Sequence, residues 1–382
     1  VKAVPLSHVV PAERRQRSDL GTRMKNDSTL IMVETDEGLT GLGAALGNPE
    51  VVRAIVDYEL GPDIIGMDPM FSERIYEYMY NGSRAANVMD QGWSTPPASR
   101  RRGVVMESIS GIDLAVWDVK AQALGVPIYK ALGASRDCIR GYGSGGWAPG
   151  EESEREMAGY AAKGFTAVKM ELLFGSAATD LQLSDCIREG RAALGPDIVM
   201  LVDFGYRWTH WRDALAVLRR VEDCDLWLVE AAVDHDDLDG HAKLAPRIGP
   251  RLGGAELAGT VRECRAWIEL GRVDVLQPDV ARAGGLTEMR RIAEFAALHG
   301  VEVVPHNWKT GINAAAARHL QAAMPNVPLI EMFTADLFES PLRRGLVGPE
   351  PVLDAGMLPL PSGPGLGVTL DPAVVDRYQV AT

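Results

Sequence analysis

Ionisable residues close a regular series of short apolar runs in the second half of the chain. The run FTAVKME places Lys169 and Glu171 two residues apart, and residues with that spacing point to the same face of a β-strand. Later runs end in, or carry, one further acid or imidazole each, namely Asp203, Glu230, Glu256, Asp279, His306 and Glu331. From Asp203 onward these residues are 23 to 27 positions apart, which is typical of one strand, one helix and their loops. The spacing therefore predicts one charged group near the end of each strand.

The same runs alternate with helical patterns, and this alternation predicts an α/β fold built on a (β/α) barrel. Eight strands are expected, over residues 138–144, 165–171, 198–203, 225–230, 251–256, 273–279, 301–306 and 327–332. An open doubly wound sheet is the alternative, although the first strand is not followed by the GxGxxG motif of a dinucleotide-binding fold. In a barrel the C-terminal strand ends meet at one mouth, so the charged groups would gather there.

Three of these groups are carboxylates that would lie on adjacent strands. Asp203, Glu230 and Glu256 would repel one another strongly unless a cation neutralises them. Carboxylate oxygens are the ligands that Mg²⁺ prefers, and Mg²⁺ leaves positions open for water or substrate oxygens. Zinc is less suited, because the trio contains no histidine or cysteine. The sequence therefore predicts a magnesium site.

The remaining groups suit proton transfer beside a carboxylate. Asp279 could orient the imidazole of His306 and raise its basicity, which makes His306 a candidate general base. Lys169 would stand next to the metal trio, and Glu331, if protonated, could donate a hydrogen bond to developing charge. A proton α to a carboxylate is a very weak acid, so metal, lysine and donor would have to stabilise the enediolate together.

The first part of the chain is organised differently. Residues 28–45 contain two strand-like runs around an Asp-Glu-Gly turn, which predicts a hairpin, and residues 108–125 predict a long amphipathic helix that ends at a glycine. This α+β pattern ends near Gly133. The late segment PSGPGLG lacks the Lys and Ser/Thr of a phosphate loop, so we expect a turn that returns the chain to the first domain.

Composition limits the possible partners. The chain has 382 residues, 46% hydrophobic and 24% charged, which is typical of a soluble globular protein with two domains or one large barrel. A net charge of −13 disfavours nucleic acid, and the lack of an eighteen-residue apolar run predicts no membrane span. The four cysteines are far apart and form no CxxC pair, which predicts reduced thiols in a cytoplasmic protein.

With these motifs in place, the sequence resembles the enolase superfamily, specifically its mandelate racemase-like subgroup. The match to metal ligands rests on Asp203 in LVDFGY, Glu230 in LWLVEAA and Glu256 in GGAEL. Asp279 in LQPDVARAGGLTE and His306 in VVPHNWKTG resemble the Asp–His dyad of that subgroup, and Glu331 in LIEMF resembles its electrophilic acid.

The resemblance implies a modified (β/α)7β TIM barrel with an N-terminal α+β capping domain. The capping domain would span residues 1–133 and be completed by the tail, 352–382, and the barrel would span 134–351. Cap loops, here near Arg14–Arg23 and Gly43–Glu50, would close over a small-molecule carboxylate. The resemblance also implies Mg²⁺ and a homo-oligomer, from a dimer to an octamer.

The sequence departs from the subgroup on its second barrel strand. That strand commonly carries Lys-x-Lys, whose second lysine is a base, but here Glu171 occupies the second position. With His306 as the single base, the resemblance implies a lyase that dehydrates an acid sugar, an aldonate or aldarate, to a 2-keto-3-deoxy acid. Glu171 and Trp308 would then contact substrate. Two alternatives stay open: an epimerase, racemase or cycloisomerase acting on a sugar acid or lactone, and a non-catalytic binding barrel.

Overall fold

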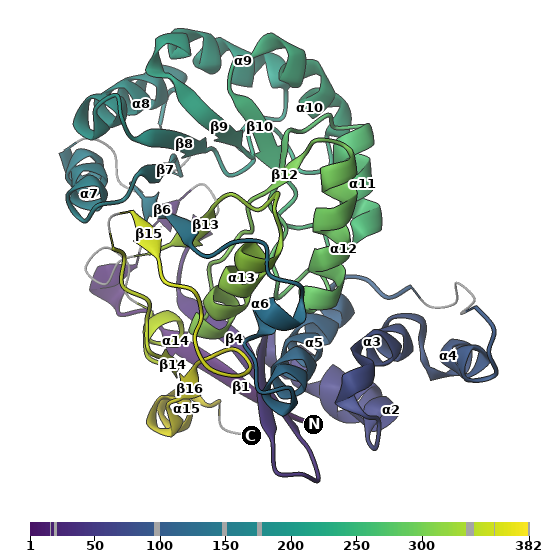
Figure 1. The fold of residues 1–382 in the computed structure, drawn as a ribbon. Helices are drawn as coiled ribbons and strands as arrows, with labels where there is room; N and C mark the ends of the chain where they lie inside the picture. The colour runs from purple at the N-terminus through teal and green to yellow at the C-terminus, as the bar shows by residue number, and fades with distance from the viewer. Residues whose placement is uncertain are drawn as a thin grey trace.

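The computed structural model describes residues 1–15, 17–18, 21–94, 100–146, 151–173, 178–333, 340–354 and 356–380. Figure 1 shows a parallel sheet ringed by helices, drawn in teal and green, which rests on an N-terminal layer of purple strands and blue helices. No helix in the described part of the chain is long and apolar enough to cross a bilayer.

All eight predicted barrel strands are present. They are β6 (Ile139–Gly145), β7 (Ala167–Glu171), β8 (Val199–Asp203), β9 (Leu226–Glu230), β10 (Arg251–Gly254), β11 (Val275–Leu276), β12 (Glu302–Val303) and β13 (Ile330–Met332). Their order is β12-β11-β10-β9-β8-β7-β6-β13, and neighbours in this order run parallel. The fold is therefore the predicted barrel and not an open doubly wound sheet.

Asn307 joins the two ends of this sheet. Its backbone N–H donates to Glu331 Oε2 at 3.0 Å, and its side-chain amide donates to the Glu331 carbonyl at 3.2 Å. Asn307 follows β12 and Glu331 belongs to β13, so these two bonds link the strands between which no ladder pairing is assigned in the described residues.

Helices fill every connection between the barrel strands. In the described part these are α7 (Glu151–Ala162), α8 (Asp180–Leu194), α9 (Trp211–Arg220), α10 (Leu238–Leu244), α11 (Val261–Glu269), α12 (Gly285–Leu298) and α13 (Gly311–Ala323). The alternation gives the predicted (β/α)7β order. The sequence patterns did not predict α10, because it has only seven residues and follows an Asp-rich turn. Asp237 starts it by accepting a hydrogen bond from the Gly240 N–H.

Strand alternation brings the charged residues to one end of the barrel. A buried cluster inside the strands is made of Tyr142, Ala167, Leu201, Leu228, Val275, Val304 and Leu329. The residue two positions after each of the first four points to the same side of its strand, and these residues are Ser144, Lys169, Asp203 and Glu230. We call this buried cluster the apolar plug of the barrel. A layer of polar side chains follows it directly at the barrel mouth.

The N-terminal part contains the predicted hairpin, β4 (Lys25–Glu34) and β5 (Thr40–Ala45), in an antiparallel sheet of order β1-β4-β5. Strand β1 (Lys2–Val9) was not predicted. It contains Pro5, which is compatible with its place at the sheet edge because an edge strand can lack one N–H.

The predicted long helix is α5 (Val104–Ala123), and it begins before the predicted start at residue 108. It packs so closely on β5 that a Cβ on Gly43 would stand 1.9 Å from the Gly111 carbonyl oxygen. Glycine is therefore required where this helix crosses the strand.

Shorter elements complete the chain. The N-terminal part also contains η1 (Ala12–Arg14), β2 (Arg17–Ser18), β3 (Gly21–Thr22), α1 (Pro49–Ile55), η2 (Val56–Leu60), α2 (Gly61–Ile64), η3 (Pro69–Phe71), α3 (Ser72–Asn81), α4 (Ser83–Asp90) and α6 (Ile128–Ala131). The remaining elements are η4 (Glu222–Cys224), η5 (Ala245–Arg247), α14 (Pro341–Arg344), β14 (Val347–Gly348), β15 (Met357–Leu358), β16 (Thr369–Leu370) and α15 (Pro372–Tyr378).

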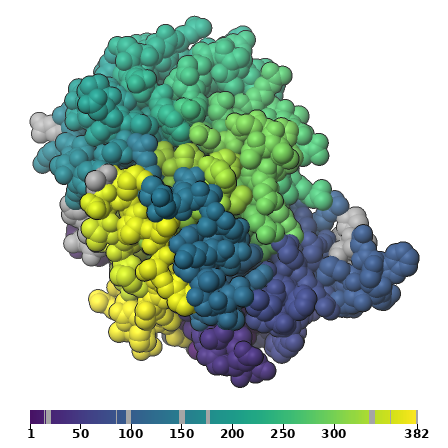
Figure 2. Space-filling view, in the orientation of Figure 1, coloured from purple at the N-terminus to yellow at the C-terminus, as the bar shows by residue number. Residues whose placement is uncertain are grey.

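The tail contacts both parts of the molecule. Strand β15 pairs antiparallel with barrel strand β6. Farther on, the Leu366 N–H donates to Asp118 Oδ1 on α5 at 2.8 Å, and Gly365 exchanges backbone hydrogen bonds with the segment before α6. Figure 2 shows the yellow C-terminal residues lying against the blue-teal residues between the two parts. The PSGPGLG segment is thus a turn on the first domain, whereas the exact domain limits stay a prediction.

His319 joins the tail, α6 and barrel helix α13. Its Nδ1 accepts a hydrogen bond from the Tyr129 N–H at 3.1 Å, and its Nε2 lies 3.1 Å from the Leu366 carbonyl oxygen, to which it donates. A neutral imidazole satisfies both contacts. Burial lowers the pKa of His319 to about 3, so the folded protein holds this ring uncharged.

Acid should therefore weaken the fold through His319. The pKa of a histidine in the unfolded chain is about 6.5, so below this pH His319 binds a proton in the unfolded chain but not in the folded one. The free energy of unfolding therefore falls by about 2 kcal/mol between pH 6.5 and pH 5. Urea unfolding at several pH values measures this, and His319→Gln should flatten the slope. The exposed His299 supplies the control, His299→Gln. Equal slopes in wild type and His319→Gln would contradict the assignment.

Candidate active site

Lys169 stands at the centre of the charged layer. Its Nζ lies 2.9 Å from Glu230 Oε2 and 3.0 Å from Glu331 Oε1. It also lies 3.5 Å from Asp203 Oδ2 and 3.6 Å from Glu171 Oε1. The side chain is 1% exposed, and the charges of its carboxylate neighbours outweigh burial and raise its pKa well above the usual value. Lys169 is therefore a buried ammonium that four acids share.

The predicted metal trio lies on three successive strands. Asp203 and Glu230 are register partners on β8 and β9, and Glu256 follows the next strand, β10. Burial raises the pKa of Asp203 to about 7 and that of Glu230 to about 8; repulsion from neighbouring acids adds to this and Lys169 opposes it. Both carboxyl groups would therefore gain from a further cation.

The donor chemistry of the trio fits Mg²⁺, which takes carboxylate oxygens. In the described residues, however, no three acidic, imidazole or thiolate side chains already stand in a metal-binding arrangement. Lys169 now contacts two of the three acids, Glu230 and Asp203. A metal ion would have to share these carboxylates with the ammonium.

Asp279 and His306 form the predicted pair. His306 Nδ1 lies 2.7 Å from Asp279 Oδ2, and the other Asp279 oxygen accepts from the Ala281 N–H at 2.7 Å. These contacts assign the proton to Nδ1 and leave Nε2 directed to Glu256, 3.5 Å away. Burial lowers the pKa of His306, but the bond to Asp279 and the charge of Glu256 outweigh it and raise this pKa to about 10.

Glu331 is an acceptor in this structure. Its Oε2 accepts from the Asn307 N–H, and its Oε1 faces Lys169. Burial raises its pKa, but Lys169, His306 and the Asn307 N–H together lower it below the usual value. This shift favours the ionised carboxylate, which accepts hydrogen bonds, whereas the predicted role of hydrogen-bond donor needs the protonated form and stays a prediction.

Glu171 is held by a partner that the sequence patterns did not single out. The Ser144 hydroxyl donates to Glu171 Oε1 at 2.6 Å, and burial raises the pKa of Glu171 to about 7 although Lys169 opposes the shift. Ser144 closes the first predicted strand, 138–144. Its place at a strand end is a signal for it in the sequence, although serine is not ionisable.

The backbone two residues after Asp203 requires a glycine. Gly205 has φ +55°, and a Cβ there would stand 2.2 Å from Leu173 Cδ2. Its N–H donates to Asp203 Oδ1 at 2.8 Å. The backbone thus orients Asp203 at a position where a side chain would collide. The next residue, Tyr206, is turned to His235, with its hydroxyl 3.4 Å from Nδ1.

The expected cap loops are only partly described. Of the segment near Arg14–Arg23, residues 16, 19 and 20 lie outside the described residues. The Arg23 guanidinium lies 5.8 Å from the centre of the Trp308 ring, and Trp308 stands edge-on to Phe333 at 5.1 Å. In the other expected loop, the Leu46 N–H donates to the Ala281 carbonyl. Both loops therefore contact residues that follow Asp279 or His306.

Comparison with known protein families decides the relationship. Residues 152–374 match the family described as enolase C-terminal domain-like, and residues 4–133 match the N-terminal domain of mandelate racemase and muconate lactonizing enzyme. The chain belongs to the enolase superfamily. Its subgroup is that of mandelate racemase and muconate lactonizing enzyme, as the strand-end motifs predicted.

Named relatives act on sugar acids or their lactones. The chain is 32% identical over 366 residues to D-galactarolactone cycloisomerase of Agrobacterium fabrum, covering 92% of this chain and 91% of the relative. It is 31% identical to arabinonate dehydratase of Saccharolobus solfataricus, covering 91% and 89%. A racemase from Streptomyces coelicolor, whose crystal structure holds bound magnesium, shares the fold with a TM-score of 0.85 at 24% identity, over 99% of both chains.

Replacing Lys169 should destabilise the barrel. In Lys169→Met the neighbouring acids keep their burial and lose their shared cation, and breaking a buried ion pair costs about 3–5 kcal/mol. Urea unfolding in a chelating buffer measures the loss. Lys130→Met, on the exposed side of α6, is the control and should change stability little. A Lys169→Met protein as stable as wild type would show that the acids do not depend on this ammonium.

Proposed function

We propose that the protein abstracts the proton α to the carboxylate of an acid sugar and eliminates water, giving a 2-keto-3-deoxy acid. The observation that carries this proposal is the Asp279–His306 pair, which faces the carboxylate layer around Lys169 while an acid, Glu171, occupies the place of a second lysine base. One base on one side of the substrate suits an elimination better than a racemisation, which needs proton transfer on two faces.

Asp203, Glu230 and Glu256 would hold Mg²⁺, the ion that enolase-superfamily sites use. When bound, the cation would offset the negative charge that grows on the substrate carboxylate as the proton leaves. Lys169 would face the same carboxylate from the neighbouring strand, because its Nζ already lies 2.9 Å from Glu230. Glu331, 3.0 Å from that Nζ, would keep the lysine charged and in place.

His306 would take the α-proton at Nε2. Asp279 fixes the proton on Nδ1, so the Nε2 lone pair is the one available to the substrate. The charge of Glu256 is one reason for the high pKa of His306, and a cation on Glu256 would reduce that effect and favour the basic form. The imidazolium would then give its proton to the departing β-hydroxyl, so that water leaves and the enol product tautomerises to the ketone.

Glu171 and Trp308 would contact the distal part of the substrate. Glu171 retains one oxygen besides the Oε1 bonded to Ser144, and that oxygen could accept from a sugar hydroxyl. Trp308 would offer an aromatic face next to His306. Neither residue supplies a proton acceptor comparable to a second lysine.

Cycloisomerisation of a sugar lactone is the second candidate. It begins with the same α-proton abstraction, and the 32% identity to D-galactarolactone cycloisomerase favours it. The two reactions differ in product, because only dehydration of a free acid releases a 2-keto-3-deoxy acid. A non-catalytic binding barrel would turn over neither substrate class.

We further propose a cytoplasmic homo-oligomer, from a dimer to an octamer, that takes a small carboxylate as its only substrate partner. All four cysteines are thiols, which suits a reducing compartment. Large apolar side chains lie exposed on the N-terminal domain, among them Tyr58, Ile65 and Phe71, and such exposure suits a subunit interface. Sedimentation at micromolar concentration would contradict the oligomer if it found only a 41.3 kDa species.

Activity should require a divalent cation. A chelator should abolish release of 2-keto acid from aldonates and aldarates, and added Mg²⁺ should restore it. Asp203→Asn, Glu230→Gln and Glu256→Gln should each lose activity because each removes one anionic ligand. Asp234→Asn, an exposed acid after β9, serves as the control. Full activity in all three ligand variants would overturn the metal assignment.

Replacing the proposed base should lower turnover. His306→Asn should reduce it by about a hundred- to ten-thousandfold, which is the usual contribution of a general base.

The α-proton should exchange on one face only. In D₂O, wild type should give no recovered substrate of inverted configuration, as proton NMR can establish. Inversion at a rate comparable to elimination would require a second base, with Lys169 or Glu171 the candidates.

A further inference from the structure

A short turn before α12 is bonded to the N-terminal domain at three of its residues. It begins at Asp279, after β11, and ends at Gly284, before α12 starts at Gly285. Asp279 itself anchors the segment, because its carbonyl accepts from the N–H groups of Arg282 and Ala283. The residue that orients His306 is thus the first residue of a tight turn.

Helix α5 of the N-terminal domain provides the partners of this turn. The Ser110 hydroxyl accepts from the Gly284 N–H at 2.7 Å, and Glu107 Oε1 lies 3.1 Å from Arg282 Nε. Before α5, the Leu46 N–H donates to the Ala281 carbonyl. Three of the residues that follow Asp279 therefore have bonds to the other domain.

Asp113 holds the start of α12. Its two oxygens accept from Thr287, one from the backbone N–H at 2.9 Å and one from the hydroxyl at 2.6 Å. The same hydroxyl accepts from Trp117 Nε1 at 2.8 Å. Gly285 packs so tightly on Asp113 that a Cβ would stand 2.3 Å from Oδ2. Asp113 and Thr287 are at most 1% exposed, so bulk solvent does not reach this contact.

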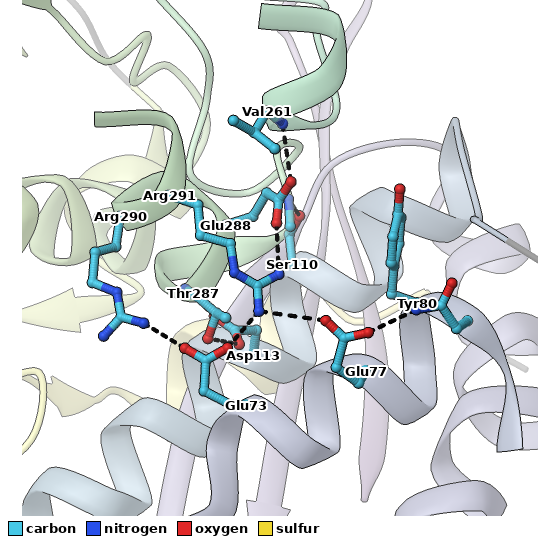
Figure 3. A network of polar contacts seen from close by, with 12 residues as sticks. Glu73, Glu77, Tyr80, Ser110, Asp113, Val261, Thr287, Glu288, Arg290 and Arg291 are labelled. Atoms are coloured by element: carbon cyan, nitrogen blue, oxygen red, sulfur yellow. Dashed lines mark hydrogen bonds and ion pairs between the residues drawn. The ribbon is translucent and has the colours of Figure 1, made fainter. Parts of the chain in front are cut away.

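The outer edge of the interface between α12 and the N-terminal domain is held by ion pairs rather than by buried hydrogen bonds. Figure 3 shows Arg290 and Arg291 of α12 reaching the acids of α3, Glu73 and Glu77, while Thr287 turns inward to Asp113. The Glu73 side chain is 47% exposed. Exposed pairs of this type contribute little, at most about 1 kcal/mol, and they lie one helical turn farther from Asp279 than Thr287 does.

We propose that Ser110 and Asp113 of the N-terminal domain, together with Thr287 of barrel helix α12, are positioning residues for the Asp279–His306 pair and act through the turn 279–284. This inference rests on the proposed role of His306 as the base. Because Asp279 both starts the turn and bonds His306 Nδ1, a shift of α12 moves the imidazole relative to the substrate.

The test uses Thr287→Val, which keeps the shape and the backbone N–H but removes the hydroxyl, with Thr287→Ser as the conservative rescue. Thr287→Val should lower kcat by about ten- to a hundredfold, the effect of a small misplacement of a reacting group, while KM stays within about twofold. Thr287→Ser should stay near wild type. Glu73→Gln, which breaks only the outer ion pairs, should leave kcat unchanged.

A second measurement does not depend on turnover. Hydrogen exchange followed by mass spectrometry should find faster exchange of the amides in 279–284 in Thr287→Val and in Ser110→Ala, but not in Glu73→Gln. Ser110→Ala also serves if Thr287→Val does not fold.

An unchanged kcat in both inner variants, or unchanged exchange of this turn, would overturn the positioning role, and so would an equal loss in Glu73→Gln. If wild type turned over no acid sugar or lactone, the proposed function would fall, whereas the exchange result would still decide whether α5 holds the turn.

Discussion

Everything at the mouth of this barrel depends on the ammonium of Lys169. Six acids and one imidazole lie at the strand ends around it, and strand alternation places three of the acids and the imidazole two positions beyond a residue of the buried apolar cluster. Without a cation, the burial of so many carboxylates would cost several kilocalories per mole for each ion. Lys169 lies within 3.6 Å of four of the acids, so it makes the arrangement possible before any metal or substrate arrives.

The molecule contains a second set of buried acids that it satisfies in a different way. Asp118 accepts from the backbone N–H groups of Leu42 and Leu366, both at 2.8 Å, and Asp113 accepts two bonds from Thr287. These acids need no cation because fixed donors surround them. Structural carboxylates such as Asp113 and Asp118 therefore accept bonds from fixed N–H and O–H groups. The carboxylates at the mouth instead surround one buried lysine, Lys169.

The repeating part of the structure could be predicted from the sequence, and the parts that depend on single long-range contacts could not. The spacing of Asp203, Glu230 and Glu256 follows from the length of a β/α unit, so it is a local property. Closure by Asn307, the bond from Ser144 to Glu171 and the capture of Asp118 by the tail join residues 24, 27 and 248 positions apart. The periodic pattern of apolar residues along the sequence does not predict such single contacts. The contact of Glu331 with Lys169, at 3.0 Å, likewise joins residues far apart in the sequence.

The exchange of a lysine for Glu171 is more than the loss of one base. A second ammonium at that position would add a cation beside Lys169, whereas Glu171 adds a fourth acid to its surroundings and strengthens its hold on the proton. Lys169 with a pKa raised by these neighbours is suited to bind a carboxylate and poorly suited to remove a proton. In the proposed reaction, Glu171 would therefore act on one side of the substrate: it would replace one base and make the neighbouring lysine a poorer one. In the proposed reaction, His306, whose Nε2 is directed away from Asp279, would then be the group best placed to accept the α-proton.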